Sequence, residues 1–332
     1  MRAMVLRQQG PAEQHPLRLE DVQQPTPAPG EVRVRVSVCG VCHTDLHIVE
    51  GDIHPPALPL IPGHQVVGAI EALGPNVKTH REGDRVGIPW LYSTDGTCAY
   101  CRRGQENLCE AARFTGFHVN GGYTEFVNVP AESAYPVPKV FTDLNAAPLL
   151  CAGVIGYRSY RLSGIHQGET IVLLGFGGSA HIVLQLAKRE GCTVYVITRS
   201  EKHQQLAREL GAAWVGIAQD QPPSIADAAI VFAPAGALVP RALRAIRKGG
   251  TVALAGITMS DIPQMPYELL YHERILRSVA NSTHQDVRDF LSLAAEIPVR
   301  TTVDEFPLEQ ANEAILAMKH SKMEGAAVLR VA

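Results

Sequence analysis

A glycine-rich turn stands between an apolar run and an amphipathic segment, and this junction restricts the fold of the chain more than any other feature. The run Thr170–Leu174 has the length and composition of a strand buried on both faces. The segment Ser179–Glu190 places its apolar residues on one helical face, and Gly191 ends it. The G-x-G-x-x-A sequence Gly175–Ala180 joins the two. Strand, glycine turn and helix in this order predict a doubly wound parallel sheet that binds a dinucleotide.

Strands and helices continue to alternate beyond this turn, as in other α/β domains. We expect three further strands and two further helices: strands over Thr193–Ile197, Ala228–Phe232 and Thr251–Ala255, and helices over Glu201–Leu210 and Arg241–Arg247. Residues 153–295 are therefore predicted to form the cofactor-binding domain.

The first half of the chain has a different pattern, with short alternating runs bounded by proline and glycine. Glu31–Val38, Gln65–Ala72 and Gly122–Val129 have the period of two that is typical of strands. We predict a compact, barrel-like β-rich domain over residues 1–152, and we expect residues 296–332 to return to it.

The small residues of the glycine turn would allow a pyrophosphate to bind close to the backbone. Gly175 allows a tight turn, Gly177 lets the backbone approach the anion, and Ala180 permits close packing of helix on strand. Glycine turns are also common without a cofactor, so the flanking strand and helix carry the argument. The predicted cofactor contacts are Gly175, Gly177, Gly178 and Ala180.

The end of the second strand predicts which cofactor binds. Enzymes that use NAD usually place an acid there, but this chain has Thr198-Arg199-Ser200. A guanidinium and two hydroxyls favour a 2′-phosphate, and so NADP over NAD. The alternative is that Arg199 is a solvated loop residue or stacks on the adenine of NAD.

Charge and hydropathy exclude several classes of function. The chain has 30 basic and 33 acidic residues, for a net charge of −3, so no basic field is available for a nucleic-acid backbone. The longest uncharged stretch, Leu144–Tyr157, is too short to span a membrane, and Arg2 and Arg7 interrupt any leader-like run. We expect a cytoplasmic protein with no membrane or nucleic-acid partner.

Five of the seven cysteines lie between Cys39 and Cys109, and three of these form a C-x₂-C-x₇-C loop. Clustered cysteines in a reducing compartment are more often metal ligands than disulfides. Structural zinc needs four ligands, and Asp95 stands three residues before Cys98, where another cysteine would fit the spacing. We predict a structural zinc site from Asp95, Cys98, Cys101 and Cys109, with one oxygen ligand that could weaken it or leave it empty.

A second set of cysteines and histidines is spread along the first 153 residues. It comprises Val38–His47, which contains Cys39 and Cys42, the Pro62-Gly63-His64 segment, and Cys151. Catalytic zinc takes three protein ligands and keeps one position open, and two cysteines with one histidine are a known set for alcohol chemistry. Each residue alone is weak evidence, since a single cysteine is usually a small buried hydrophobe.

At this point the sequence resembles the zinc-dependent medium-chain alcohol dehydrogenases over essentially the whole chain. The matching segments follow the order of that family: Gly40–Asp45, Pro62–His64, Ile88–Tyr92, Gly121–Phe126, Leu150–Gly153 and the glycine turn. The resemblance implies a GroES-like catalytic domain beside a Rossmann domain. The length resembles the tetrameric bacterial and yeast-type members, which implies a homotetramer.

The resemblance also implies roles for single residues. Cys42, His64 and Cys151 would hold the catalytic zinc, Cys39 would be a bystander, and Asp45 would orient His64. Thr44 would accept the alcohol proton, His47 would pass it on through the cofactor ribose, and His43 would lie against the pyrophosphate. A histidine taken alone is usually structural, and only the resemblance favours the relay role for His47.

Several positions depart from the family or bear on the substrate. Gln65 stands where an acid commonly follows the ligand histidine, and Asp95 replaces the first cysteine of the structural site. Trp90 is expected to line the substrate pocket, with an ordinary core tryptophan as the alternative, and Ile53 stands where small-alcohol members often carry Trp. A roomier pocket for medium aliphatic or aromatic alcohols follows from Ile53.

The predicted function is reversible hydride transfer between a primary alcohol or aldehyde and NAD(P), with NADP preferred and zinc as the Lewis acid. Three alternatives stay open: a zinc-free quinone or enone reductase, a polyol or sugar dehydrogenase, and a non-catalytic dinucleotide-binding sensor. The presence of all three of Cys42, His64 and Cys151 argues against the zinc-free reductase.

Overall fold

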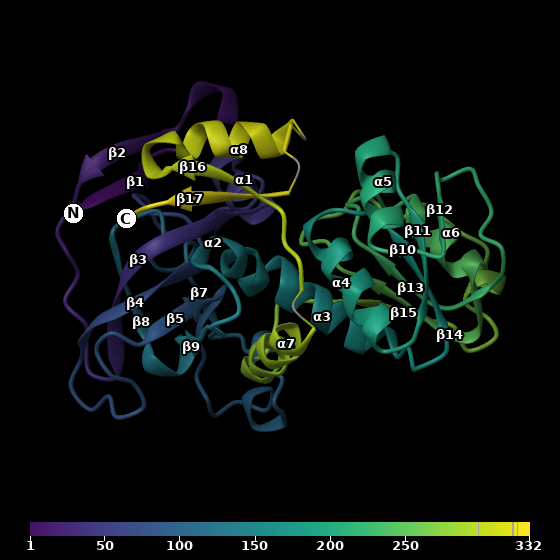
Figure 1. The fold of residues 1–332 in the computed structure, drawn as a ribbon, viewed down its shortest axis with the longest axis horizontal. Helices are drawn as coiled ribbons and strands as arrows, with labels where there is room; N and C mark the ends of the chain where they lie inside the picture. Colours follow the sequence, from purple (N-terminus) through teal and green to yellow (C-terminus); the bar gives the residue numbers. More distant parts are fainter. Residues whose placement is uncertain (298, 321, 324) are drawn as a thin grey trace. The chain divides into compact units, whose positions relative to one another are not determined.

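The computed structural model describes residues 1–297, 299–320, 322–323 and 325–332 (Figure 1). The chain divides into two compact units, Met1–Cys151 with Asn281–Ala332, and Ala152–Ala280. The first boundary differs by one residue from the predicted one, but the chain returns to the first unit at Asn281 instead of residue 296.

Helix α7 (His284–Glu296) accounts for this difference. Its first backbone N–H donates to a carboxylate oxygen of Glu106 at 2.7 Å, and the His284 ring pairs with the Tyr135 hydroxyl. Both partners belong to the first unit. An amphipathic pattern predicts a helix but does not indicate which unit covers its apolar face.

The second unit is built on a parallel sheet. In the described chain the strands run in the order β12-β11-β10-β13-β14-β15, and every neighbouring pair is parallel. Numbered along the unit, this is the order 3-2-1-4-5-6 of a doubly wound dinucleotide-binding fold. Its elements are α3(Ala152–Ser163), β10(Thr170–Leu174), α4(Gly178–Arg189), β11(Thr193–Ile197), α5(Glu201–Glu209), β12(Trp214–Gly216), β13(Ala226–Val231), α6(Leu238–Ala245), β14(Ile246–Leu254), η6(Tyr267–Leu269) and β15(Ile275–Ser278).

The predicted strands over Thr170–Leu174 and Thr193–Ile197 have the same bounds in the structure. The helix predicted over Arg241–Arg247 begins and ends earlier, because Ile246 is already extended and pairs with Ala226. Arg247 is held in strand β14 by ion pairs to Asp227 and Glu169 on the neighbouring chain segments. The helix predicted from the sequence pattern therefore included two residues, Ile246 and Arg247, that belong to strand β14.

The first unit is a β-rich body around a large apolar core. Strand β3 lies at its centre and pairs antiparallel with β4, β8 and β17, while β16 pairs parallel with β17. The strands are β1(Arg2–Leu6), β2(Leu17–Asp21), β3(Glu31–Val41), β4(Gln65–Leu73), β5(Arg85–Ile88), β6(Leu91–Ser93), β7(Arg113–Phe114), β8(Phe126–Pro130), β9(Tyr135–Pro136), β16(Val303–Pro307) and β17(Ala326–Arg330). The helices are η1(Ala12–Gln14), α1(His43–Glu50), η2(Cys101–Arg103), η3(Glu106–Leu108), η4(Ala131–Ser133), α2(Asp143–Ala146), η5(Ala147–Leu150), α7, η7(Leu308–Gln310) and α8(Ala311–Lys319).

The strand predicted over Gly122–Val129 is only half formed, since β8 begins at Phe126. Gly122 and Tyr123, which come shortly before β8, pack on Pro62 and Gly63, the two residues before His64. Tyr123 donates its N–H to the Pro62 carbonyl at 3.0 Å, and Gly63 leaves no room for a Cβ, which would meet the Tyr123 ring at 2.4 Å. Gly63 also has a φ of 97°, which glycine adopts without strain.

Within the described residues, no helix combines the length and the apolar character needed to cross a bilayer.

Candidate active site

Cys42 lies where strand β3 ends and helix α1 begins. It is the N-cap of α1, and its Sγ accepts a hydrogen bond from the Thr44 N–H at 3.3 Å. Asp45, at the third helical position, completes a capping box by accepting the Cys42 N–H at 3.0 Å. A thiol at a helix N-terminus is stabilised as the thiolate, which is the form that binds metals.

His64 precedes strand β4 and is completely buried. Its Nδ1 lies 3.2 Å from Asp45 Oδ1, and the same oxygen accepts the Gly63 N–H at 3.2 Å. Asp45 is also completely buried. Since a carboxylate only accepts hydrogen bonds, Nδ1 carries a proton, and Nε2 is the nitrogen that faces Cys42 and could bind a metal ion in place of a proton.

Cys151 follows helix η5 and completes a cluster with these two residues. The Cys42 Sγ lies 3.1 Å from His64 Nε2 and 4.0 Å from the Cys151 Sγ, and all three ligand atoms lie within 4.8 Å of one another. Tetrahedral zinc would require about 3.5 Å between sulfur and nitrogen and about 3.8 Å between sulfurs. The donor atoms, their spacing and the orienting carboxylate therefore fit a zinc ion.

The charges of the cluster also fit a cation. Burial alone would raise the pKa of Cys42, but the hydrogen bond from Cys151 and the charge of His64 hold that pKa well below its ordinary value. Burial alone would lower the pKa of His64, but the Cys42 thiolate and Asp45 raise it well above its ordinary value. A site that attracts a proton so strongly also attracts a metal ion in its place.

The other residues predicted for catalysis lie on α1. Thr44 is nearly buried, His43 is exposed at the first helical position, and His47 is partly exposed. His47 Nδ1 lies 2.7 Å from Asp52 Oδ2. The helix therefore carries Thr44 and His47 one turn apart, beside the Cys42 thiolate.

Trp90 lies beside the cluster. Its ring stacks on Phe114 with centroids 4.4 Å apart, and the His64 ring is 6.0 Å away. Among the residues that the structure describes, the buried Trp90 Nε1 has no hydrogen-bond partner. Gln65 is buried, and its side chain packs against Gly40, where an added Cβ would come within 3.0 Å of it.

A second cluster forms in the loop around η2 and η3. Ligand atoms of Asp95, Cys98, Cys101 and Cys109 lie within 4.8 Å of one another, and the four residues range from exposed to buried. Asp95 Oδ1 accepts the Cys98 N–H at 2.8 Å and the Thr97 N–H at 2.7 Å, and these donors hold the pKa of the carboxyl below its ordinary value. Asp95 is thus an ionised carboxylate among three thiols, which suits zinc with one oxygen ligand.

The thiols of this loop differ in their acidity. The Cys101 N–H lowers the pKa of Cys98, while burial raises the pKa of Cys101 to about 11. The Cys98 and Cys101 sulfurs are 3.6 Å apart, and all seven cysteines are free thiols.

The glycine turn of the second unit has the predicted shape. Gly175 has a φ of 92°, and a Cβ there would meet the Ala233 nitrogen at 2.8 Å. Gly177 is the N-cap of α4, and nothing lies within 4 Å of the position of its missing Cβ. Gly178 begins the helix and Ala180 is completely buried. Open space before a helix N-terminus fits an approaching pyrophosphate.

The three residues after β11 differ in their surroundings. Thr198 is nearly buried, and the Ser200 hydroxyl accepts the His203 N–H as the N-cap of α5. Arg199 is exposed between them. The guanidinium is therefore the group of this segment best able to meet a phosphate.

Two residues of these sites had no signal in the sequence. Asp52 contacts His47 from a turn, and Glu106 joins the second cluster to α7. Each stands in a polar loop where acidic residues are common, and only the folded chain brings each to its partner.

Two family models match the chain. The Alcohol dehydrogenase GroES-like domain matches residues 28–139, and the Zinc-binding dehydrogenase domain matches residues 178–296. A probable alcohol dehydrogenase, AdhA, of Mycobacterium tuberculosis (strain CDC 1551 / Oshkosh) is 45% identical over 100% of this chain and 97% of that protein. An alcohol dehydrogenase of Geobacillus stearothermophilus is 39% identical over 95% of this chain and 96% of that protein.

Solved structures agree with these matches. An NAD-dependent alcohol dehydrogenase superposes with a TM-score of 0.91 at 25% identity, and the match covers 100% of both chains. Fold, family models and relatives point the same way: the chain belongs to the zinc-dependent medium-chain alcohol dehydrogenase family.

Proposed function

We propose that this protein is a zinc-dependent alcohol dehydrogenase that transfers hydride between primary alcohols or aldehydes and a nicotinamide cofactor. The observation that carries the proposal is the cluster of Cys42, His64 and Cys151, with the buried Asp45 on the far nitrogen of His64. A zinc-free reductase of the same fold would not need this ligand set, so the cluster supports the zinc-dependent reaction.

Bound at this cluster, zinc would supply a Lewis acid that lowers the pKa of an alcohol oxygen. The hydride chemistry would belong to the nicotinamide. The protein's own residues position and deprotonate the substrate. Thr44 accepts the hydroxyl proton, and His47, one turn further along α1, passes it toward solvent. The loop of Asp95, Cys98, Cys101 and Cys109 would hold a second, structural zinc.

We assign NADP as the preferred cofactor. The glycine turn Gly175–Ala180 would bind the pyrophosphate, and the exposed Arg199 would pair with the 2′-phosphate, since the first three residues after β11 include no acid before Glu201. His43, exposed at the start of α1, is the further residue proposed to meet the pyrophosphate.

The substrate class follows from the apolar wall beside the cluster. Trp90 and Phe114 present stacked aromatic rings next to His64, which favours apolar substrates. Ile53 is smaller than the Trp found in small-alcohol members, so we propose medium aliphatic and aromatic primary alcohols.

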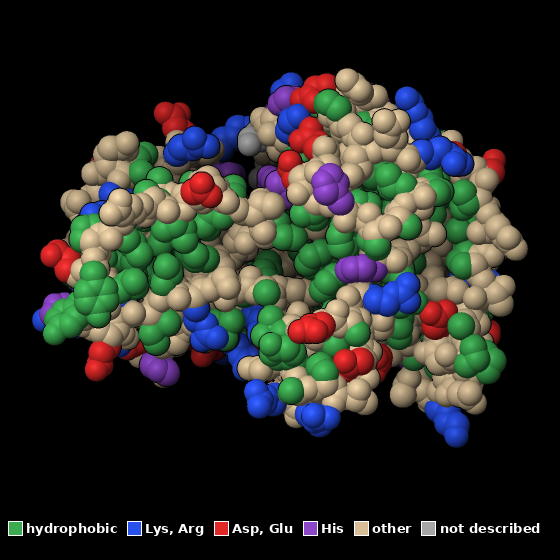
Figure 2. All heavy atoms as spheres, turned by 180° about the vertical axis from the view of Figure 1, so that it is seen from behind, with side chains coloured by type: hydrophobic (Ala, Val, Ile, Leu, Met, Phe, Trp, Pro, Cys, Tyr) green, Lys and Arg blue, Asp and Glu red, His purple; other side chains and the backbone are tan. Residues whose placement is uncertain are grey.

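We propose that copies of the chain associate as a homotetramer. Strand β15 is the last strand of its sheet and carries the exposed Ile275, and Tyr267 and Tyr271 nearby in sequence are 74% and 58% exposed. Figure 2 shows hydrophobic side chains gathered over one face of this unit. Exposed sheet edges and apolar areas favour self-association, and light scattering at several concentrations tests it.

The first test is the initial rate of NADP and NAD reduction with a panel of primary alcohols, with and without a zinc chelator. We expect chelator-sensitive turnover that favours NADP, and we expect Arg199→Gln to raise the KM for NADP about tenfold, as loss of one charged contact does, but not that for NAD. Absence of turnover with every alcohol and aldehyde, despite cofactor binding, would refute the proposed function. Equal KM values for both cofactors in the wild type would refute the assignment to NADP.

A further inference from the structure

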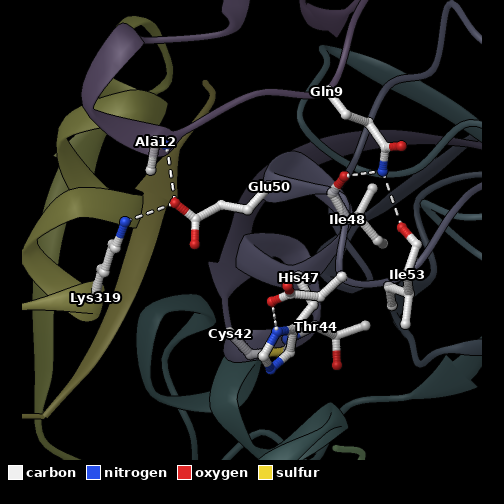
Figure 3. A network of polar contacts seen from close by, with 10 residues as sticks. Gln9, Ala12, Cys42, Thr44, His47, Ile48, Glu50, Ile53 and Lys319 are labelled. Atoms are coloured by element: carbon white, nitrogen blue, oxygen red, sulfur yellow. Dashed lines mark hydrogen bonds and ion pairs between the residues drawn. The ribbon is translucent and has the colours of Figure 1, made fainter.

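His47 is held by the carboxylate of Asp52, a residue to which the proposed function gives no role. Its Nδ1 lies 2.7 Å from Asp52 Oδ2, and the side chains are 18% and 55% exposed, respectively. Figure 3 shows His47 on α1 with this contact on one ring nitrogen and with Thr44 on the same helix. The pair is therefore partly open to solvent, and Asp52 is its more exposed member.

The contact selects one tautomer of His47. An ionised carboxylate has no proton to donate, so the imidazole donates from Nδ1 and keeps its lone pair on Nε2. Nε2 lies on the opposite side of the ring from Asp52 and is the nitrogen that can accept a proton. Loss of Asp52 would remove this preference for the Nδ1–H tautomer.

The turn that carries Asp52 is tightly held. Gly51 adopts a left-handed φ of 92°, and the His47 carbonyl accepts the N–H groups of Gly51 at 3.1 Å and Ile53 at 3.3 Å. The Gln9 side-chain amide donates to the carbonyls of Ile48 at 2.6 Å and Ile53 at 2.9 Å (Figure 3).

The other end of the Gln9 side chain holds the turn as well. Gln9 Oε1 lies 2.8 Å from His54 Nδ1. Since the residues on both sides of Asp52 are bonded, the carboxylate is presented to His47 from a fixed backbone.

We propose that Asp52 is a positioning residue for proton release. It holds His47 in the Nδ1–H tautomer and stabilises the imidazolium that forms when Nε2 takes up the substrate proton. The positive charge of the ring is then balanced by the carboxylate, and the proton leaves Nε2 to water, which restores the neutral Nδ1–H tautomer of His47. The inference rests on the proposed path through Thr44 and His47.

A purely structural role is the competing interpretation. Exposed ion pairs contribute little to stability, and His47 lies in the last turn of α1, where a cation is favourable in any case. The two interpretations differ in one respect. A positioning residue acts only through His47, whereas a structural contact affects the protein whether or not His47 is a base.

A double-mutant cycle separates them. We expect His47→Gln to lower kcat for alcohol oxidation at pH 7 about 10²-fold and Asp52→Ala about tenfold, in the range of general-base effects. The double variant should be no slower than His47→Gln alone, because Asp52 has no effect without the imidazole. Equal losses from Asp52→Ala in both backgrounds, or no loss at all, would overturn the proposal.

Glu50→Gln is the matched control. Glu50 is a carboxylate on the same helix, but it binds the Ala12 N–H and Lys319 instead of His47 (Figure 3). It should change thermal stability more than Asp52→Ala and leave kcat unchanged. A loss of kcat in Glu50→Gln equal to that in Asp52→Ala would overturn the specific role of Asp52.

A second measurement does not depend on turnover. In ¹⁵N-imidazole NMR of the wild type, His47 should show Nδ1 protonated and Nε2 as the acceptor, and Asp52→Ala should raise the population of the Nε2–H tautomer. An unchanged spectrum overturns the inference even if the enzyme is active. Absence of alcohol turnover in the wild type would instead refute the proposed function. The tautomer held by Asp52 would then have no role in catalysis.

Discussion

The two clusters of metal-ligating side chains are built in opposite ways. Cys42, His64 and Cys151 come from three distant segments and meet beside the completely buried Asp45, with His64 buried and the two cysteines partly buried. Asp95, Cys98, Cys101 and Cys109 fall within 15 residues in the loop around η2 and η3, and Asp95 is exposed. The first cluster exists only because β3, β4 and η5 fold together, whereas the second can form within one loop.

This difference suggests a catalytic role for the first cluster and a structural role for the second. A buried cluster with three protein ligands leaves a coordination position for substrate, while four ligands on one loop close the coordination shell. The exposed loop is linked to the rest of the unit through the hydrogen bond from α7 to Glu106. We therefore expect changes at the first cluster to alter catalysis and changes at the second to alter stability.

The largest effect is expected from Cys42→Ser. Loss of the thiolate should lower kcat/KM at least about 10³-fold, since metal Lewis-acid catalysis contributes several kcal/mol. Serine is also a good N-cap, so the unfolding temperature should change little. Cys39→Ala is the matched control at a buried cysteine outside the cluster, and it should keep its activity. Loss of activity in Cys39→Ala but not in Cys42→Ser would show that the ligand assignment is wrong.

The next largest effect is expected from Asp45→Asn. The neutral amide is a poorer acceptor for His64 Nδ1, so zinc affinity and kcat/KM should each fall about 10–100-fold. Competition with a chromophoric chelator measures the affinity. Unchanged zinc affinity would mean that the buried cluster does not depend on its orienting carboxylate.

Asp95→Cys tests the second cluster, where we expect a change in stability. Four thiolates bind zinc more tightly than three with one oxygen, so the first unit should unfold at a higher temperature, by about 2–4 °C for each kcal/mol gained. The reaction rate should stay the same. Asp95→Asn, which keeps the shape but weakens the ligand, should lower the unfolding temperature. A change in kcat without a change in stability would contradict the structural role.

The smallest effect is expected from Glu106→Gln. Its carboxylate accepts the His284 N–H at the start of α7, and replacing this charged acceptor should cost about 1 kcal/mol in the free energy of unfolding. Denaturant titration measures the loss, and Glu110→Gln, an exposed glutamate of the same loop, is the control. An equal loss in both variants would indicate that only the loop's charge matters.

Much of the site was predictable because its signals are local. The glycine turn and the strands over Thr170–Leu174 and Thr193–Ile197 stand as predicted, since backbone conformation and burial pattern appear directly in short stretches of sequence. The grouping of Cys98, Cys101 and Cys109 was likewise expected from their spacing. Arg247 was misassigned to a helix because its strand is stabilised by ion pairs from distant residues.

The features that the sequence did not predict depend on contacts that only the folded chain makes. The pairing of Asp52 with His47 needs the turn at Gly51 and the Gln9 amide, 42 positions before Gly51, and the docking of α7 needs Glu106 from the cysteine loop. Residue types and spacings thus identify which groups can do chemistry. The distances between these groups and the burial of each arise only when segments far apart in the chain are packed together, because those quantities belong to pairs of residues and not to any one stretch of sequence.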